Sequence, residues 1–265
     1  MHATEREELI LNLLRLKGFV GFQELERRVK GSAATLRRDL GRLEEQGKLV
    51  RVRGGAKRTE EESSPPSQLS GASFQENVSR NRKEKEAIGK AAAALCQPGE
   101  SIIIDGGSTT FQMCAHLEPL RLHVLTNSLY IVSALLPHRA THVSMPAGAL
   151  YREQNILLSP FEDDGMGRYR ASKLFMGAAS IGPHGLMQSD AVLVQVERRL
   201  LGRAQEMIVL VDSSKFDAPT GHTVCPLSDI DVVITDSRIA QKHLKMLKKA
   251  GVKTIVVDPD AKQIR

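Results

Sequence analysis

The stretch SAATLRRDL, residues 32–40, places a serine before two alanines, a pair of adjacent arginines and two leucines. Serine is a preferred N-cap residue, so we expect a helix that begins here and runs to about Gly47. At 100° per residue, Leu36, Leu40 and Leu43 share one face of that helix. This face is expected to pack against a hydrophobic core, which leaves the arginines on or beside the outer face.

The outer face of this predicted helix suits entry into a DNA major groove. Ala34 and Arg38 lie on it, and Thr35 flanks them. Small side chains allow close approach to the bases, methyl groups can contact thymine, and arginine can bind guanine or phosphate. The helix N-terminus also favours phosphate. We expect Asp39 to pair with a neighbouring arginine, since DNA would repel a bare carboxylate.

The flanking residues complete a small module of three helices and a hairpin. Apolar residues recur at helical spacing between 9 and 16, and Leu25 and Val29 predict a short second helix. The run KLVRVRGG, residues 48–55, alternates like a strand and ends in a turn. Its two arginines share one face and could grip the DNA backbone. The predicted DNA contacts are Ser32, Ala34, Thr35, Arg37, Arg38, Arg42, Arg51 and Arg53.

The charge distribution separates this module from the rest of the chain. Residues 1–58 contain fourteen basic and eight acidic residues, whereas the other 207 residues carry 23 of each, so the whole net charge of +6 lies in the first fifth. A basic module on a neutral body indicates a polyanion partner for the module alone. The alternative reading of the charge is a solvated basic face with no partner.

Composition indicates a cytoplasmic protein with no membrane partner. Hydrophobic residues make up 41% of the 265 residues, and no apolar run approaches the length of a membrane-spanning helix. The charged N-terminus lacks the apolar region of a secretory signal. The three cysteines are odd in number and widely separated, which favours a reduced compartment over a disulfide framework.

The remainder of the chain indicates α/β organisation. Residues 59–80 are polar, contain Pro65-Pro66 and lack periodicity, so they predict a linker. From 81 to 265, short apolar runs alternate with helical stretches, which predicts an α/β domain with a largely parallel sheet. The predicted strands are 101–105, 123–126, 142–145, 207–212, 231–235 and 254–258.

Polar loops follow three of these predicted strands. The first, DGGSTT (Asp105–Thr110), has glycines for close backbone approach and hydroxyls as donors, as a phosphate cradle needs. A tight turn without a ligand is the alternative for this loop. The others are Thr126–Ser128 and Asp212–Lys215. Ligands of open α/β sheets bind at the carboxyl ends of strands, so we expect these loops to surround one small phosphorylated molecule.

The run TLRRDLGRLEEQGKLVRVRGGA, residues 35–56, resembles the winged helix-turn-helix of the DeoR family of bacterial transcriptional regulators. The three loops match that family's D-G-G-[ST]-T-T, T-N-S and D-S-S-K-F motifs, so the resemblance covers nearly the whole chain. Lys30-Gly31-Ser32 departs from the family's usual turn before the recognition helix. The resemblance implies an effector domain similar in fold to ribose-5-phosphate isomerase.

The resemblance also implies a phosphorylated sugar or polyol effector, with phosphate at Gly106–Thr110 and sugar hydroxyls near Asn127 and Lys215. Residues 145–148 read Met-Pro-Ala-Gly where the family usually has two glycines, which would change one wall of the pocket. The predicted effector contacts are Asp105, Gly106, Gly107, Ser108, Thr109, Thr110, Thr126, Asn127, Ser128, Gly148, Asp190 and Lys215.

Taken together, the residues and the resemblance predict a DNA-binding regulator. We expect a repressor of a carbohydrate-use operon that binds double-stranded operator DNA as a homo-oligomer, a dimer or tetramer. We expect no catalytic residues, no cofactor and no structural metal, since His138 and His142 have ligand spacing only on a helix and Pro137 precedes them.

Two other functions are open. A sugar-phosphate isomerase or lyase with an added N-terminal module would use Asp105, Asp190 or Asp212 as general base and Lys215 as electrophile. That reading leaves the basic module unexplained. A DNA-binding scaffold without a small ligand is the third possibility.

Overall fold

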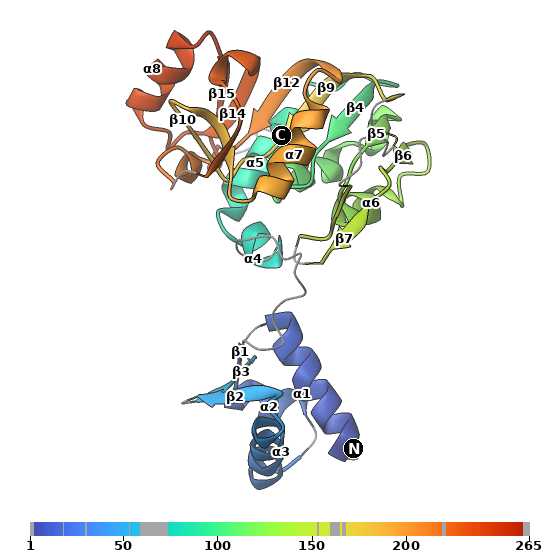
Figure 1. The fold of residues 1–265 in the computed structure, drawn as a ribbon, viewed down its shortest axis with the longest axis vertical. Coiled ribbons are helices and arrows are strands. Elements are labelled where there is room, and N and C mark those ends of the chain that lie inside the picture. The colour runs from blue at the N-terminus through green and yellow to red at the C-terminus, as the bar shows by residue number, and fades with distance from the viewer. Residues whose placement is uncertain are drawn as a thin grey trace. The chain divides into compact units, whose positions relative to one another are not determined.

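The computed structural model divides into two compact units, Met1–Ser67 and Gln68–Arg265 (Figure 1). Each unit has its own hydrophobic core, so each is considered by itself. The residues described are 3–17, 19–29, 31–52, 54–58, 74–152, 154–159, 165, 168–218 and 221–261.

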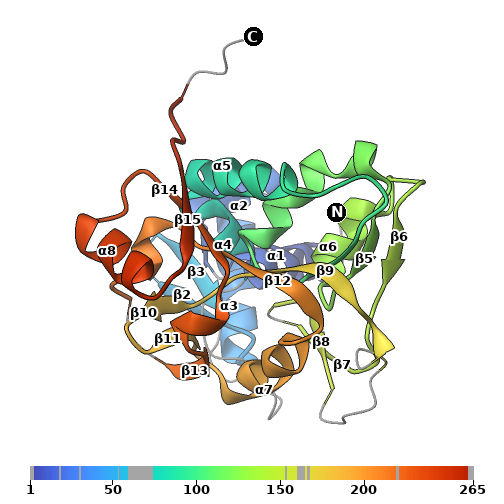
Figure 2. The same ribbon diagram turned by 90° about the horizontal axis from the view of Figure 1, so that it is seen from above.

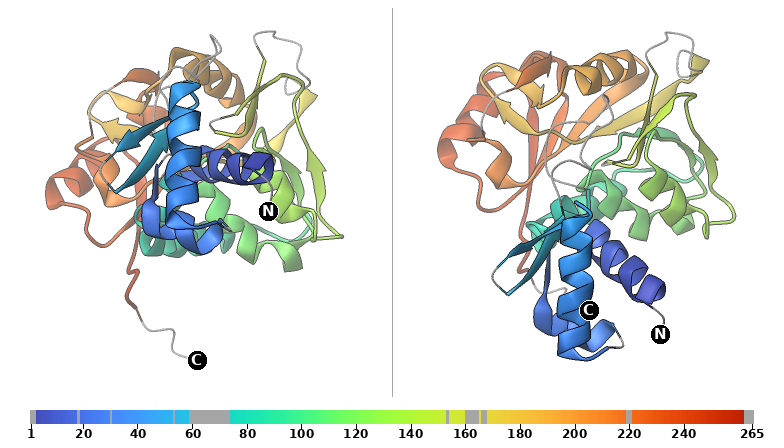
Figure 3. Two further views of the ribbon diagram at one scale, coloured as in Figure 1. Left: turned by 90° about the horizontal axis from the view of Figure 1, so that it is seen from below. Right: turned by 60° about the horizontal axis from the view of Figure 1, so that its bottom comes forward.

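The first unit combines three helices with a three-stranded antiparallel sheet of order β1-β3-β2. The hairpin β2–β3 lies alongside α3 (Figure 3). The hairpin was predicted, but β1 was not, because three residues are too few to show an alternating pattern. In sequence order the elements are α1 (Ala3–Lys17), β1 (Phe19–Gly21), α2 (Phe22–Arg28), α3 (Ala33–Glu45), β2 (Leu49–Val52) and β3 (Gly55–Arg58).

The predictions for the helix after residue 32 are confirmed. The Ser32 hydroxyl accepts a hydrogen bond from the backbone amide of Thr35 at 3.2 Å, which caps α3. The three leucines on its inner face are buried and join a core contributed by all three helices and the sheet. The buried members of this core are Ile10, Leu13, Leu14, Val20, Leu25, Val29, Leu36, Leu40, Leu43, Leu49 and Ala56.

The two glycines of the hairpin turn are needed for different reasons. Gly54 has a φ of +91°, a conformation that other residues adopt only with strain. Gly55 pairs with Gly21 of β1, and a Cβ atom there would lie 2.2 Å from the carbonyl oxygen of Val20. The turn therefore needs one glycine for its angle and the other for the close approach of β1.

The second unit is built on a seven-stranded sheet of order β15-β14-β12-β9-β4-β5-β6, in which all neighbouring strands run parallel. Two smaller antiparallel sheets, β10-β11-β13 and β7-β8, accompany it. The strands are β4 (Ser101–Ile104), β5 (His123–Leu125), β6 (His142–Ser144), β7 (Ala149–Tyr151), β8 (Ile156–Leu158), β9 (Ala171–Met176), β10 (Ser180–Gly182), β11 (Gly185–Gln188), β12 (Ala204–Leu210), β13 (His222–Cys225), β14 (Val232–Asp236) and β15 (Lys253–Val257).

Helices cover both faces of the large sheet. Two hydrophobic clusters lie on its opposite faces, one packed by α5, η2 and α6, the other by α7 and α8. Figure 2 shows α5 and α7 on opposite sides of β9 and β12. The helices are α4 (Phe74–Ser79), α5 (Arg82–Ala93), α6 (Leu129–Leu135), α7 (Ala191–Leu200) and α8 (Gln241–Lys249), with the 3₁₀ helices η2 (Thr110–His116), η3 (Glu118–Leu120), η5 (Ser213–Lys215) and η6 (Leu227–Asp229).

The six strands predicted from apolar runs are present, but the central strand β9 was missed. Its sequence, ASKLFM, contains Lys173, which breaks the apolar run that a buried strand usually shows. Lys173 forms an ion pair with Glu100 in the segment just before β4. The charge is therefore accommodated by a partner that lies 73 residues away in sequence.

Two further features bear on the predicted organisation. Helix α4 occupies Phe74–Ser79, at the end of the predicted linker, and the earlier residues 59–73 of that linker lie outside the described residues. Within the described segments, no helix is long and apolar enough to cross a membrane.

Substituting Gly89 tests the contact between α5 and η2. A Cβ atom at Gly89 would lie 2.6 Å from Cβ of Gln112 and 2.7 Å from its backbone carbon. We expect Gly89→Ala to destabilise the second unit by about 1–3 kcal/mol through overpacking, measured as a lower thermal unfolding midpoint. Gly177→Ala is the matched control, because nothing lies within 4 Å of a Cβ there. Equal stability of both variants would contradict this account.

Candidate DNA-binding and effector sites

The outer face of α3 is open, as a recognition helix requires. Ala34 and Arg38 are exposed, and Arg38 forms no ion pair with another described residue. Thr35 is half-buried, and its hydroxyl lies 2.9 Å from that of Ser32 within the helix cap. The N-terminal half of α3 therefore presents small side chains beside the guanidinium group of Arg38, which has no ion-pair partner among the described residues.

Arg37 is held beside this face by an aromatic ring. Its guanidinium carbon lies 5.3 Å from the ring centroid of Phe22, the first residue of α2. A cation above an aromatic face is attracted by the ring's electrons and loses some of its rotational freedom. Arg37 is therefore partly preorganised, which lowers the entropic cost of ordering it on DNA.

Asp39 fixes the recognition helix to α1. Its carboxylate is 3% exposed. It accepts hydrogen bonds from Nε of Arg6 at 2.7 Å and from Nη2 of Arg42 at 3.0 Å, which confirms the predicted pairing with an arginine. Arg42 also pairs with Glu7. Arg42 was predicted to contact DNA, and its existing ion pairs give it a part in holding α3 in place.

The predicted wing lies beside the recognition helix. The Arg51 amide donates to Oε1 of Glu44 at 2.9 Å, which links β2 to α3. The side chain of Arg51 is exposed and passes close to Gly41, whose missing Cβ would lie 3.8 Å from Nη1. Arg53, the other predicted wing contact, lies outside the described residues.

The second unit has a topological switch point between β4 and β9. From β4 the chain passes to β5 and β6 on one side, and then returns to β9, β12, β14 and β15 on the other. The loops at the carboxyl ends of β4 and β9 consequently diverge and leave room for a ligand. We call Asp105–Thr110 loop 1, Thr126–Ser128 loop 2 and Asp212–Lys215 loop 3; these follow β4, β5 and β12.

Loop 1 presents unused backbone donors. The amides of Gly107, Ser108 and Thr109 make no hydrogen bond to another described residue. The Thr110 hydroxyl, in contrast, is buried and donates to the carbonyl oxygens of Asp105 and Gly107 at 2.8 and 2.9 Å. Thr110 therefore shapes the loop, and the three amides before it form the part that could bind an anion.

Loop 2 braces loop 1. The Asn127 side chain accepts from the Gly106 amide at 2.8 Å and donates to Asp105 at 3.1 Å. The hydroxyls of Thr126 and Ser128 accept hydrogen bonds from backbone amides of their own segment, and Ser128 thereby caps α6. The side chain of Asn127, predicted to bind sugar hydroxyls, and the hydroxyls of Thr126 and Ser128 are thus already hydrogen-bonded to protein groups.

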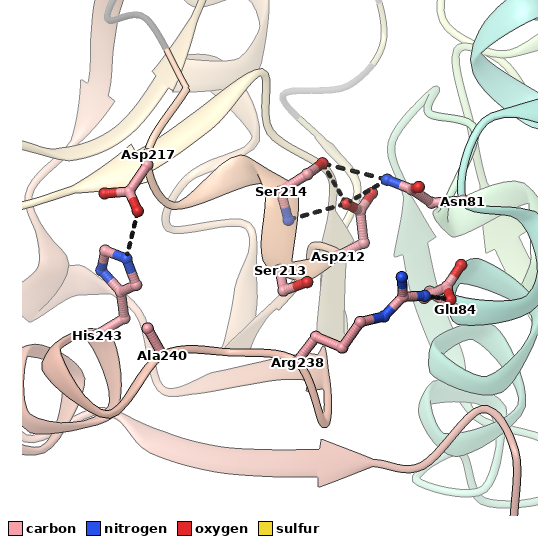
Figure 4. Close-up of a pocket in the computed structure, with 9 residues that line it drawn as sticks. All are labelled: Asn81, Glu84, Asp212, Ser213, Ser214, Asp217, Arg238, Ala240 and His243. Carbon is pink, nitrogen blue, oxygen red and sulfur yellow. Dashed lines mark hydrogen bonds and ion pairs between the residues drawn. The ribbon is translucent and has the colours of Figure 1, made fainter.

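Loop 3 lines a pocket of about 180 Å³ (Figure 4). Oδ1 of Asp212 accepts hydrogen bonds from Asn81 at 2.9 Å and from the Ser214 amide at 3.1 Å. Oδ2 of Asp212 is buried and has no hydrogen-bond partner among the described residues. Across the pocket, Arg238 reaches Glu84 and His243 bonds Asp217 at 3.2 Å. An unpartnered buried carboxylate oxygen is costly and is suited to accept from a ligand hydroxyl.

Lys85 adds a buried cation next to loop 3. Its side chain is 2% exposed, and its ammonium group donates to the carbonyl oxygen of Asn77. Burial lowers the pKa of Lys85 to about 8, the nearby carboxylate of Asp212 opposes this shift, and the charges of Lys215 and Arg80 add to it. The positive charges of Lys85, Lys215 and Arg80 thus repel one another near loop 3, and a bound anion would reduce this repulsion.

A carboxyl pair lies beneath loop 1. Asp105 is 4% exposed and Glu197, on α7, is 3% exposed. Burial raises the pKa of Glu197 well above its ordinary value, and the charge of Asp105 raises it further. Burial also raises the pKa of Asp105 to about 6, against hydrogen bonds from Gly106, Asn127 and Glu197. These directions leave one proton on the pair, carried by Glu197, whose Oε1 accepts from Gln188 at 2.7 Å and whose Oε2 has no partner among the described residues.

The remaining predicted contacts have local roles. Asp190 caps α7, with Oδ1 accepting from the Val192 amide at 2.8 Å. Gly148 allows close approach of the chain to β8, because a Cβ there would lie 2.7 Å from the Leu158 carbonyl oxygen. The ring of His142 stacks on the ring of His123, with 4.8 Å between the ring centroids. The stacking partner of His142 is therefore His123 and not His138, the residue with which it has ligand spacing. Within the described segments, no group of three or more His, Cys, Asp or Glu could hold a metal ion.

Three residues of this region were missed from the sequence: Asn81, Lys85 and Glu197. Asn81 and Lys85 flank the start of α5, where polar residues are ordinary and carry no signal. Glu197 lies in a helix that contains two arginines, so it resembled a solvent-exposed charge. Only the return of the chain to loop 1 and loop 3 shows that these side chains face a site.

A winged helix-turn-helix followed by a parallel α/β unit with a polar switch point defines a transcriptional regulator with a sensor domain. Residues 6–62 match the model of the DeoR-like helix-turn-helix domain, and residues 80–237 match that of the DeoR C terminal sensor domain. The chain belongs to the DeoR family of transcriptional regulators.

Relatives align over nearly the full length. A protein of Escherichia coli O157:H7 named as an aga operon transcriptional repressor is 33% identical over 259 residues, which cover 96% of this chain and 94% of that protein. The HTH-type transcriptional regulator UlaR of Shigella dysenteriae serotype 1 is 30% identical over 259 residues, covering 97% of this chain and all of UlaR. These relatives are transcriptional regulators.

Solved structures are similar at a lower level. Ribose 5-phosphate isomerase A from Methanocaldococcus jannaschii has a TM-score of 0.38 and 19% identity, covering 51% of this chain and 55% of that one. eIF2B delta from Chaetomium thermophilum has a TM-score of 0.42 and 18% identity, covering 58% of this chain and 56% of that one. No functional conclusion follows from similarities of this size.

The exposed position of Arg38 yields a prediction about base recognition. Arg38→Ala should weaken binding to the preferred duplex by about 1–3 kcal/mol and relax base preference, if the guanidinium binds a base edge. Fluorescence anisotropy with a set of duplexes measures both effects. Arg139→Ala, which removes an exposed arginine of the second unit, should change neither. Equal weakening on every duplex would contradict base contact by Arg38.

The carboxyl pair yields a prediction about pH. Both folded-state pKa values are raised, so the folded chain must retain protons and loses stability as pH rises from about 4.3. Glu197→Gln keeps the shape and removes that cost. We expect similar unfolding midpoints for variant and wild type near pH 4.5, and a variant more stable by about 1–2 kcal/mol at pH 8. The exposed control Glu118→Gln should not show this divergence, and parallel pH profiles for Glu197→Gln would refute the shared proton.

Proposed function

We propose that this regulator represses a carbohydrate-use operon and is released from its operator when a phosphorylated sugar or polyol binds at loops 1 and 3. The observation that carries the proposal is a set of open groups at the carboxyl ends of β4 and β12. Among the described residues, three consecutive amides of loop 1 have no partner, and neither does Oδ2 of Asp212 in loop 3, which lies near Lys85 of α5.

The spacing of these groups suits a small phosphorylated molecule. Strands β4 and β12 are separated only by β9, so their carboxyl ends lie about 10 Å apart at about 4.8 Å per strand. A phosphoryl group on the amides of Gly107–Thr109 would leave the other end of a sugar near Asp212 and Lys215. The amides attract the phosphoryl group, while at loop 3 the carboxylate accepts from hydroxyls and the Lys215 ammonium group donates to them.

Coupling between the sites accounts for regulation. The recognition helices of an oligomer must meet half-sites about one helical turn of DNA apart, so the proposed homo-oligomer contains at least two chains. If the effector favours another arrangement of the N-terminal units, DNA and effector each weaken binding of the other by the same factor, typically about 5–150-fold. Function in the cytoplasm, where operator DNA and sugar phosphates are both available, is part of this proposal.

Sensing without catalysis is the other part of the proposal. An isomerase needs a carboxylate that is free to take a substrate proton. Here Asp105 is buried and accepts a hydrogen bond from Asn127. Oδ2 of Asp212 has no partner among the described residues, and in this proposal it accepts from a ligand hydroxyl and takes no proton. We therefore expect binding without turnover when pentose and hexose phosphates are followed by NMR. Conversion between aldose and ketose would overturn this part.

A thermal-shift screen of pentose, hexose and polyol phosphates tests the proposal directly. At least one compound should raise the unfolding midpoint of the wild type. Lys215→Gln should weaken binding of that compound by about 10- to 100-fold, because one charge-assisted hydrogen bond is worth about 1.5–3 kcal/mol. Isothermal titration calorimetry gives the affinities.

Lys245→Gln is the matched control, since Lys245 is an exposed lysine on α8 away from loop 3. Binding to DNA in the absence of the compound should be equal in both variants and the wild type. The proposal would be wrong if no phosphorylated compound shifted the midpoint, or if the two lysine variants bound it equally well.

A further inference from the structure

The segment Phe74–Asn81, which we call the strap, consists of α4 and the turn before α5. It is the first described segment after the N-terminal unit along the chain, and it belongs to the compact unit that contains the loops (Figure 1). One of its ends contacts residues that adjoin loops 1 and 2, and the other end contacts loop 3.

The first end of the strap packs against residues adjoining loops 1 and 2. Phe74 is 4% exposed. Its ring stacks on Tyr130 at 4.0 Å with planes 10° apart, and meets Phe111 edge-on at 5.6 Å and 87°. Phe111 directly follows loop 1, and Tyr130 is the second residue after loop 2. Such aromatic pairs stabilise the packing beyond the effect of their buried area.

The other end of the strap is bound to loop 3. The side-chain amide of Asn81 donates to Asp212 at 2.9 Å and lies 3.2 Å from the Ser214 hydroxyl (Figure 4). Asn81 has a φ of +51°, in the left-handed region that asparagine tolerates better than most residues. The backbone therefore turns sharply here, which directs the side chain into loop 3.

Lys85 connects the middle of the strap to the same site. Its ammonium group donates to the carbonyl oxygen of Asn77 in α4, although the carboxylate of Asp212 and the charge of Lys215 are both near enough to affect its pKa. An ammonium group has three donor hydrogens, so effector oxygens that reach Lys85 can compete with the Asn77 carbonyl oxygen for it.

We propose that the strap is the relay between effector and DNA: effector oxygens bound at loop 3 compete with the Asn77 carbonyl for Lys85, and α4 then shifts on loops 1 and 2. This inference rests on the proposed function of the site. It adds the element that senses occupancy. The strap directly precedes α5 and follows the residues that lead from the N-terminal unit, so a shift of α4 changes the constraint on that unit.

The relay is tested by measuring how strongly a sugar phosphate weakens DNA binding by the full-length protein. The measured quantity is the ratio of two dissociation constants for a duplex from the protein's own promoter, one with and one without a saturating sugar phosphate from the thermal-shift screen. Phe74→Ala should bring this ratio close to one while the affinity for the sugar phosphate changes by less than about threefold. Asn81→Gly, which keeps the positive φ, should also reduce the ratio.

Ser79→Ala is the control on the same helix. Among the described residues, the Ser79 hydroxyl bonds only within α4, to the carbonyl oxygen of Glu76 at 2.8 Å. It should couple like the wild type. A wild-type ratio in Phe74→Ala would overturn the relay. Loss of sugar-phosphate binding in Phe74→Ala, with Ser79→Ala unaffected, would also overturn it, since Phe74 would then be part of the binding site.

A second measurement needs no ligand and separates the relay from the proposed function. Hydrogen exchange of the amides in residues 74–79 should be about tenfold faster in Asn81→Gly than in wild type, because the strap loses its bond to loop 3. Unchanged exchange would overturn the relay even if a sugar phosphate binds. If exchange responds but no phosphorylated compound binds, the proposed function fails, and the relay from effector to DNA fails with it.

Discussion

The parallel pairing of β4 with β9 determines where the polar loops of the second unit can lie. Parallel strands align their carboxyl ends at one edge of the sheet, and reversal of the strand order at this pair makes the following loops diverge. On the side of β5, loop 1 is held by hydrogen bonds from Asn127 of loop 2. Every group that we assign to effector binding depends on this divergence.

Burial then divides the polar groups of the loops into two kinds. Groups that lie deep, such as Asn127 and the hydroxyl of Thr110, are saturated by protein partners, because an unpaired buried polar atom costs about 1–3 kcal/mol. Groups nearer the surface, such as the amides of the half-buried Gly107 and Ser108, have no hydrogen-bond partner among the described residues. The buried pair of Asp105 and Glu197 is an extreme case, since it retains one proton and still leaves Oε2 of Glu197 without a partner among the described residues.

In the N-terminal unit, a buried carboxylate is stabilised by two arginines. A buried aspartate in a recognition helix would be unfavourable near DNA, but Asp39 faces inward and is neutralised by Arg6 and Arg42. The pairing orients α3 against α1 and leaves Arg38 exposed. Charge on this helix is thus divided between residues that hold it in place and residues that can bind a polyanion.

The sequence alone determined the two-part organisation and the elements with strong local signals. The Ser32 cap, the inner leucines of α3, six of the strands and the motif loops could be predicted because each depends on neighbours in the chain. Only the tertiary structure revealed β1 and β9, the ion pair of Arg42 with Glu7, and the contacts of Asn81, Lys85 and Glu197. Those depend on residues far away in sequence. A charged residue shows whether it is solvated, paired or facing a ligand only when the folded chain supplies its partner.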